Sequence, residues 1–327
     1  MKKKYQNGFF LFGLAVLVIM VSQLDFSEVW QHICMAGYWF LAVVAIWALL
    51  YMMNTLSWYI IIHNGLPRKS QVSYWWLYKI TISGFALNYA TPGGLMGGEP
   101  YRIMSLKPKI GTERASSSVI LFAMTHIFSH FWFWLLSVVL FIVTQPVNVA
   151  MGILLAATTC FCLTGIWFFM TGYKKGLAVR VMNLLSHLPF IKGWAMRFVE
   201  KRRKQLDRID HQIAVLHEQN PKAFVCAVLS ELGCRIASAL EVYFILRVMM
   251  PEANYIACIL ILAFTSLFAN MLFFMPLQLG GREGGFLMSA KGLGISSSAG
   301  IMVALLVRIR ELIWTAIGLL LIKCEKN

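Results

Sequence analysis

The sequence predicts an all-α polytopic membrane protein, because of its composition and its long apolar stretches. Of its 327 residues, 59% are hydrophobic and only 13% are charged, whereas soluble domains carry about 25% charged residues. Several apolar stretches exceed the roughly 18 residues that indicate a bilayer span. A transmembrane β-barrel would instead show short segments of alternating hydrophobicity. The net charge of +15 lies mainly between the apolar stretches, which favours contacts with anionic lipid over nucleic acid.

We expect about six full spans and two further apolar segments that run into glycine-rich breaks. The apolar stretch near the N-terminus lacks a small-residue cleavage site, so we interpret it as an uncleaved first span. The seven cysteines lie mostly in apolar segments and lack metal-site spacing, so we predict no metal site and no cofactor. The full spans are about 9–24, 36–62, 115–143, 147–170, 222–249 and 296–322, and the two broken segments are about 75–91 and 254–275.

The distribution of lysine and arginine predicts that both broken segments are re-entrant hairpins. Cytoplasmic loops are rich in these residues, and the gaps on both sides of 75–91 are basic. This segment must therefore turn back within the membrane, whereas 254–275 enters from the other side and meets its own break. The segment 171–222 holds 11 of the 29 basic residues against four acids, which predicts a cytoplasmic location. Both chain termini are then expected in the cytoplasm.

The two breaks resemble each other in sequence. In "TPGGLMGGEPYR" (91–102), Pro92 precedes Glu99 by seven residues, and in "MPLQLGGREGG" (275–285), Pro276 precedes Glu283 by seven. Each break leads to a triple serine and a long apolar helix. We therefore expect one domain (1–327) with inverted repeat halves at about 36–143 and 222–322, joined by 171–222. Inverted repeats with broken helices are typical of transporters, whose binding site lies near the bilayer midplane.

The motifs "PGGLMGGEPYR" and "GGREGG", set among about eight hydrophobic segments, resemble those of the lysylphosphatidylglycerol synthase transmembrane-region, or flippase-like, family. The resemblance covers nearly the whole chain. It implies that the protein moves a lipid, such as an aminoacylated phosphatidylglycerol or another lipid-linked group, across the bacterial inner membrane. Some members of the family join this region to a soluble aminoacyl-transferase domain. The chain stops at Asn327 without such a domain, so lysyltransferase activity is not expected.

The glycines of the two breaks are candidates for contact with a lipid phosphate. Glycine lets the backbone approach a ligand closely, and a helix that begins after the break points its partly positive N-terminus toward the membrane centre. The alternative is that these glycines only allow close helix packing. The candidate residues are Gly97, Gly98, Gly280 and Gly281.

Charged residues within the apolar segments complete the predicted substrate site. Arg308 lies 12 residues into the last span, about 18 Å deep at helical rise, and an intramembrane charge indicates function by default. Its spacing allows an i,i+3 pair with Glu311. Arg235 has the spacing for an i,i+4 pair with Glu231, which is either a structural pair or part of the site.

The two break glutamates have three competing roles. Glu99 and Glu283 are predicted to pair with the nearby Arg102 and Arg282, to bind a cationic headgroup, or to carry a proton. We identify no catalytic residue, because no nucleophile or metal set accompanies the carboxylates. His126 and His130 share a helix face at i,i+4 without a third ligand, so a headgroup contact or packing is expected there.

The sequence leaves three classes of function open. The first is a lipid translocase that binds membrane lipid between the two hairpins. The others are an intramembrane enzyme acting on a lipid-linked substrate and a non-catalytic partner of envelope-synthesis proteins. No phosphate-binding P-loop pattern occurs. Apolar residues recur at helical spacing in 200–218, which predicts either an amphipathic helix on anionic lipid or an ordinary basic loop.

Overall fold

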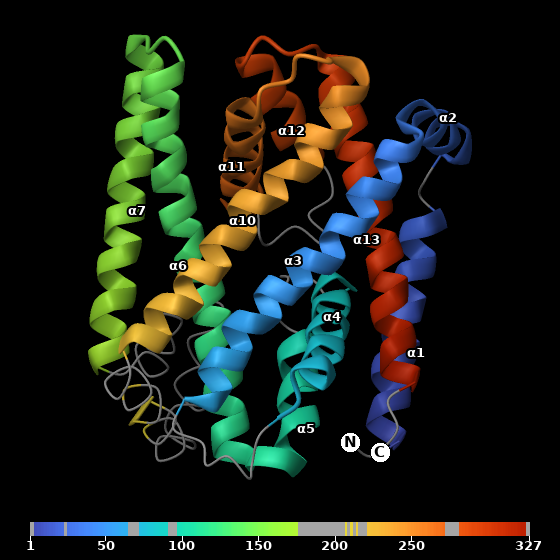
Figure 1. Cartoon of the computed structure of the whole chain (residues 1–327), viewed down its shortest axis with the longest axis vertical. Helices are drawn as coiled ribbons and strands as arrows, with labels where there is room; N and C mark the ends of the chain where they lie inside the picture. Colours follow the sequence, from blue (N-terminus) through green and yellow to red (C-terminus); the bar gives the residue numbers. More distant parts are fainter. Residues whose placement is uncertain are drawn as a thin grey trace, which may run out of the picture.

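The computed structural model shows a chain built from long helices (Figure 1). It describes residues 3–22, 25–64, 72–90, 97–175, 207, 210–211, 214, 221–271 and 281–324, and no strand occurs in these ranges. The helices are α1 (Lys3–Ser22), α2 (Phe26–Ala36), α3 (Tyr38–His63), α4 (Tyr74–Ala90), α5 (Gly98–Ile110), α6 (Thr112–Thr144), α7 (Val149–Lys175), α10 (Pro221–Met249), α11 (Tyr255–Met271), α12 (Gly281–Gly292) and α13 (Ser297–Cys324).

The expected membrane class is confirmed, and the helix bounds lie close to the expected spans. Four described helices are long and apolar enough to cross a membrane, namely α3, α6, α7 and α10. Of the other two expected spans, α1 has a shorter apolar part, Tyr5–Ile19, and α13 has 28 residues but carries charges in its middle. Helix α2 was not expected, since its segment was interpreted as an outer loop.

The connections between helices gather at two ends of the molecule (Figure 1). The described termini, the α5–α6 junction and the ends of α3 and α7 lie at the lower end of this view. The α1–α2, α6–α7, α10–α11 and α12–α13 connections lie at the upper end. The described helix ends that flank the gaps expected on one side of the membrane thus share one end. Most of the basic segment 171–222, including the expected amphipathic helix, lies outside the described residues.

Two helical pairs return to the end from which they started. Helix α5 packs back along α4, and helix α12 packs back along α11. Helix α4 begins and helix α5 ends at the lower end of the view, whereas helix α11 begins and helix α12 ends at the upper end (Figure 1). The breaks between their arms, 91–96 and 272–280, lie outside the described residues. How far these hairpins enter a bilayer stays a prediction.

The helix order repeats along the chain. A long helix, a hairpin and a second long helix occur first as α3 to α6 and again as α10 to α13. Equivalent contacts recur, because α4 packs on α13 as α11 packs on α6, and α3 packs on α6 as α10 packs on α13. Helices α3 and α10 lie side by side along much of their length and cross the centre of the molecule (Figure 1). The boundaries of the two halves stay a prediction.

The polarity of the molecule is reversed compared with a soluble protein. Large apolar side chains on the outer helices are exposed, among them Val143 and Val149 at 76% and 83%. In contrast, Arg102, Arg310 and Glu231 are buried. Two apolar cores support this interior. One includes the α4–α5 arms and the other includes the α11–α12 arms. An apolar exterior with a polar interior suits a lipid environment.

Glycine permits close contact between the two halves. Gly318 of α13 faces α4, where a Cβ atom on Gly318 would lie 2.5 Å from Ala86 Cβ and 3.0 Å from the Ile82 carbonyl oxygen. The Gly318 carbonyl also accepts a hydrogen bond from Ser83 Oγ at 3.1 Å. Because neither Ala86 Cβ nor the Ile82 backbone can rotate away, the two helices would have to move apart to admit a side chain at Gly318.

We therefore predict that Gly318→Ala destabilises the protein. Overpacking costs about 1–3 kcal/mol. A contact of 2.5 Å places Gly318 in the upper part of that range, above the gain of about 1 kcal/mol from replacing glycine inside a helix. Tryptophan fluorescence of purified protein during unfolding measures the change. Gly152→Ala is the control, because its nearest contact would be an ordinary 3.8 Å to Val147. Equal unfolding midpoints for the two variants would contradict this account of the α4–α13 contact.

Candidate functional site

The start of α5 is tied to the end of α4 by a chain of hydrogen bonds. The Gly98 backbone N–H donates to Asn88 Oδ1 at 2.7 Å, and Asn88 Nδ2 donates to Glu99 Oε1 at 3.0 Å. A Cβ atom on Gly98 would lie 2.2 Å from the Gly84 carbonyl oxygen, so only glycine fits. The N–H group expected to meet a phosphate is therefore used by Asn88. Gly98 serves close packing of the hairpin arms, which was the alternative interpretation.

Arg102 is buried against the same hairpin. Its Nη1 atom donates to Glu99 Oε1 at 3.1 Å, and the guanidinium carbon lies 4.7 Å from the ring centre of Phe85 and 5.2 Å from that of Phe122. A Cβ atom on Gly84 would lie 2.3 Å from Arg102 Nε. Glycine at this position therefore makes room for the guanidinium group. The pair between Arg102 and Glu99 is one of the three roles expected for this glutamate.

The second hairpin places its charges against α13. Arg282 donates from Nη1 to Glu311 Oε1, and Arg308 Nη1 donates to Glu283 Oε1 at 2.7 Å. The i,i+3 pair that the spacing of Arg308 and Glu311 allows does not form. Glu283, for which pairing with Arg282 was one of three open roles, pairs with Arg308 instead. Each arginine instead bridges α12 and α13, because the close packing of these helices brings their side chains within reach.

A buried charge pair joins α13 to α10. Arg310 donates from Nε to Glu241 Oε1 at 2.6 Å and from Nη2 to Glu241 Oε2 at 2.8 Å. Both side chains are at most 3% exposed. The Arg310 guanidinium also lies 3.8 Å from the Trp47 ring centre and 3.6 Å from Glu311. Glu311 thus connects Arg282 with Arg310. The four charged side chains, ordered in space as Arg282, Glu311, Arg310 and Glu241, link α12, α13 and α10.

These elements surround a central cavity of about 350 Å³. Its walls come from the middle of α3, α6, α10 and α13 and from the facing parts of both hairpins. The polar side chains that line it include Asn54, Asn88, Glu99, Arg102, His126, His130, Glu231, Arg235, Glu241, Arg282, Arg310 and Glu311.

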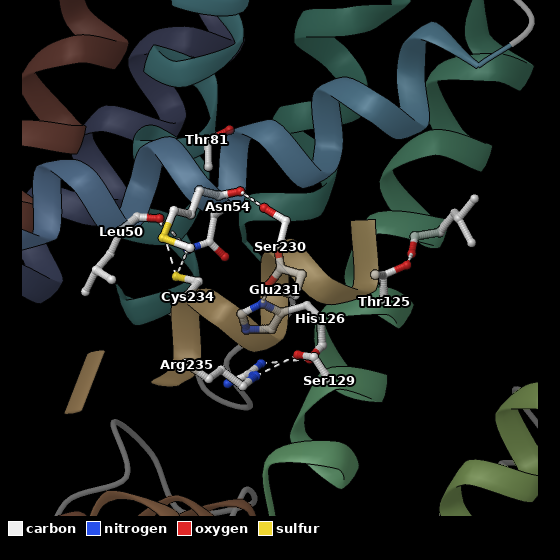
Figure 2. A network of polar contacts seen from close by, with 12 residues as sticks. Leu50, Asn54, Thr81, Thr125, His126, Ser129, Ser230, Glu231, Cys234 and Arg235 are labelled. Atoms are coloured by element: carbon white, nitrogen blue, oxygen red, sulfur yellow. Dashed lines mark hydrogen bonds and ion pairs between the residues drawn. The ribbon is translucent and has the colours of Figure 1, made fainter. Parts of the chain in front are cut away.

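Arg235 and Glu231 form the third polar cluster of the cavity (Figure 2). Arg235 donates from Nε to Ser129 Oγ and from Nη2 to the His126 carbonyl, both at 2.7 Å. Glu231 Oε2 lies 2.8 Å from His126 Nδ1, and the two groups are hydrogen-bonded. The expected pair between Glu231 and Arg235 is therefore wrong, because α6 packs against α10 and supplies nearer partners to both.

The structure brings together only some of the predicted site residues. Those that line the central cavity are Glu99, Arg102, Arg235, Arg282 and Glu311. Arg308 and Glu283 instead line a smaller depression beside it, together with Arg282 and Glu311. Gly97 stands at the start of α5 and is not among the residues that line the cavity. Gly281 stands at the start of α12, and Gly280 lies outside the described residues. Whether any of these residues binds a substrate stays a prediction.

Sequence reasoning missed the pair between Glu241 and Arg310. Both residues stand in apolar spans, where a charge is unfavourable unless it is paired, and this signal was present in the sequence. Their separation of 69 residues concealed the pairing.

For His126 and His130, no group of three metal-ligating side chains occurs among the described residues, and His126 contacts Glu231 instead.

We predict that Glu241→Gln strongly destabilises the protein. Removing one partner of a buried pair leaves an uncompensated charge and costs about 3–5 kcal/mol. The same change at Glu283 costs less, since the Glu283 and Arg308 side chains are 36% and 18% exposed. Unfolding midpoints of the two variants measure the difference. A double change, Glu241→Met with Arg310→Met, is expected to recover much of the lost stability. Equal midpoints for the two single variants would contradict a structural role for the Glu241 pair.

Comparison with known proteins agrees with this architecture. Residues 8–318 match the family described as lysylphosphatidylglycerol synthase TM region. No curated protein and no solved structure was found to match the chain. The match covers nearly all of the helices that surround the cavity, and it connects the protein to a function related to membrane lipids. The chain therefore belongs to the lysylphosphatidylglycerol synthase transmembrane-region family.

Proposed function

We propose that the protein is a lipid translocase that moves an anionic phospholipid, an aminoacyl-phospholipid or a lipid-linked group across the bacterial inner membrane. The observation that carries the proposal is the charged cavity between two hairpins that enter from opposite ends of the molecule. A lipid headgroup needs polar contacts while it crosses the apolar core. The family supports a lipid-related role without naming the substrate.

Arg235 is the side chain that best suits the lipid phosphate. Arg102, Arg282 and Arg310 each have a glutamate partner within 3.1 Å. Among the described residues, Arg235 has hydrogen bonds only to the neutral Ser129 hydroxyl and the His126 carbonyl. A guanidinium group whose hydrogen-bond partners are neutral is not held by a direct ion pair, and arginine binds phosphate through paired N–H donors.

Glu99 offers a contact for the remainder of the headgroup. Its Oε1 atom is occupied by Asn88 and Arg102, whereas its buried Oε2 atom lacks a hydrogen-bond partner among the described residues. A buried carboxylate oxygen without a donor is unfavourable. A hydroxyl or amino group of the lipid headgroup would satisfy this oxygen, which accounts for a glutamate at the start of α5.

Movement of the two halves against each other would expose the cavity to each leaflet in turn. Transporters with inverted repeats commonly work by such rocking around a fixed site. The α4–α5 and α11–α12 hairpins carry cavity residues and approach from opposite ends. We place the lower end of Figure 1 in the cytoplasm, because the flanking segments are rich in lysine and arginine. The segment 171–222 would then contact anionic lipid on that side.

We predict that Arg235→Gln lowers lipid translocation by about tenfold or more. Losing a hydrogen bond to a charged group costs about 1.5–3 kcal/mol. Purified protein in vesicles is assayed with fluorescent phosphatidylglycerol, whose outer-leaflet fraction is removed by a membrane-impermeant reductant. The matched control is Arg247→Gln, which lies on the same helix but is half-buried at its far end near Pro251 and does not line the cavity.

Other outcomes separate the alternative functions. Translocation at the wild-type rate by correctly folded Arg235→Gln protein would refute the assigned role of this side chain. A new lipid product would indicate an intramembrane enzyme, because a translocase alters no covalent bond. Absence of translocation combined with co-purifying envelope-synthesis proteins would indicate a non-catalytic partner.

A further inference from the structure

We propose that the His126–Glu231 pair binds one proton, which crosses the membrane together with the anionic lipid. The inference rests on the proposed lipid translocation and adds to it a source of energy. Among the described residues that line the cavity, Glu231 is the one carboxylate not paired with an arginine.

Glu231 has one satisfied and one unsatisfied oxygen. Its Oε2 atom lies 2.8 Å from His126 Nδ1, whereas its buried Oε1 atom has no partner among the described residues. The residue as a whole is 1% exposed. A buried carboxylate oxygen that lacks a donor has an open hydrogen-bonding position, so the pair can hold one proton at Oε1.

Groups from several helices face the pair and set its charge environment (Figure 2). Helix α3 contributes the neutral Asn54, whose Nδ2 atom donates to Cys234 Sγ at 3.1 Å. His130, on the same helix as His126, has a buried Nδ1 atom without a partner in the described part of the chain. The titratable or charged groups around Glu231 are His126 and His130 of α6, Cys234 and Arg235 of α10, and Arg102 and Glu99 of α5.

The charges of the cavity wall are balanced when the pair lacks a proton. The described lining contains four arginines and four glutamates, and the breaks 91–96 and 272–280 carry no charged residue. Three arginines pair with three glutamates, which leaves Arg235 and Glu231 as the remaining opposite charges. Proton uptake by the His126–Glu231 pair then gives the wall one net positive charge.

One net positive charge matches a lipid phosphodiester, which carries one negative charge. The loaded cavity is therefore neutral, and so is the empty, deprotonated cavity. Either state can reorient in an apolar medium without moving net charge. A proton passes from water to the pair on one side and from the pair to water on the other, so no bond of the lipid is altered. The chemistry is symport of one proton with one lipid anion.

A transmembrane pH gradient tests this coupling in the wild-type protein. Vesicles that contain fluorescent phosphatidylglycerol are made more acidic outside by about one pH unit. For one-to-one symport, the labelled lipid is expected to concentrate in the inner leaflet up to about tenfold, since a tenfold ratio corresponds to about 1.4 kcal/mol. A pH-sensitive dye inside the vesicles is expected to report proton entry together with the lipid. Reversing the gradient reverses the asymmetry.

The variants locate the proton site. Glu231→Gln keeps the shape of the side chain but cannot exchange a proton, so it is expected to reduce the gradient-driven ratio from about tenfold to about one. Ser230→Ala is the neighbouring control, because this hydroxyl donates to the Met53 carbonyl and does not line the cavity. If Glu231→Gln does not fold, the wild-type gradient measurement still decides the question.

The possible negative results of these experiments have different consequences. Lipid that moves but equilibrates evenly under the gradient overturns proton coupling and leaves lipid translocation intact. Full accumulation by the folded Glu231→Gln variant overturns the assignment of the site. Absence of any lipid movement by the wild-type protein overturns both the inference and the function on which it rests.

Discussion

The structure depends on the compensation of charges inside an apolar protein. Arg282, Glu311, Arg310 and Glu241 form a continuous series of ion pairs across α12, α13 and α10. Each charge is buried or partly buried, and each would be unfavourable alone. The series holds the second hairpin against the helices of its own half. The cavity therefore has a fixed wall, and the remaining charges acquire defined positions relative to it.

Close helix packing makes this compensation feasible. Gly84 leaves room for the Arg102 guanidinium, Gly98 lets the arms of the first hairpin meet, and Gly318 brings α13 against α4. Small residues at such contacts are typical of membrane helices, where backbones must approach closely. The glycines of the first hairpin thus act indirectly. They place Glu99 and Arg102 at the cavity, and the Gly98 N–H donates to Asn88 Oδ1.

Sequence reasoning predicted much of the fold, because hydrophobicity and basic residues are local signals. Lengths of apolar stretches placed α3, α6, α7, α10 and α13 within a few residues, and charge in the gaps predicted hairpins from opposite ends. Helix α2 was missed because its eleven residues mix polar and apolar types.

Pairings within the site were harder to predict, because they depend on contacts between distant segments. The spacing of Arg308 and Glu311 permitted an i,i+3 pair, but packing of α12 on α13 offered each a different partner. Likewise, packing of α6 on α10 gives Glu231 a hydrogen bond to His126 instead of the i,i+4 pair with Arg235. Local spacing shows which pairs are feasible, and tertiary packing selects among them.

The central claim is that the cavity binds a single lipid anion at Arg235 without altering it. Native mass spectrometry of protein purified in mild detergent tests this claim most directly. We expect the wild-type protein to retain one anionic phospholipid of unaltered mass and the folded Arg235→Gln variant to lose it. Equal retention of the same lipid by both proteins, or a wild-type protein that carries none, would contradict the account.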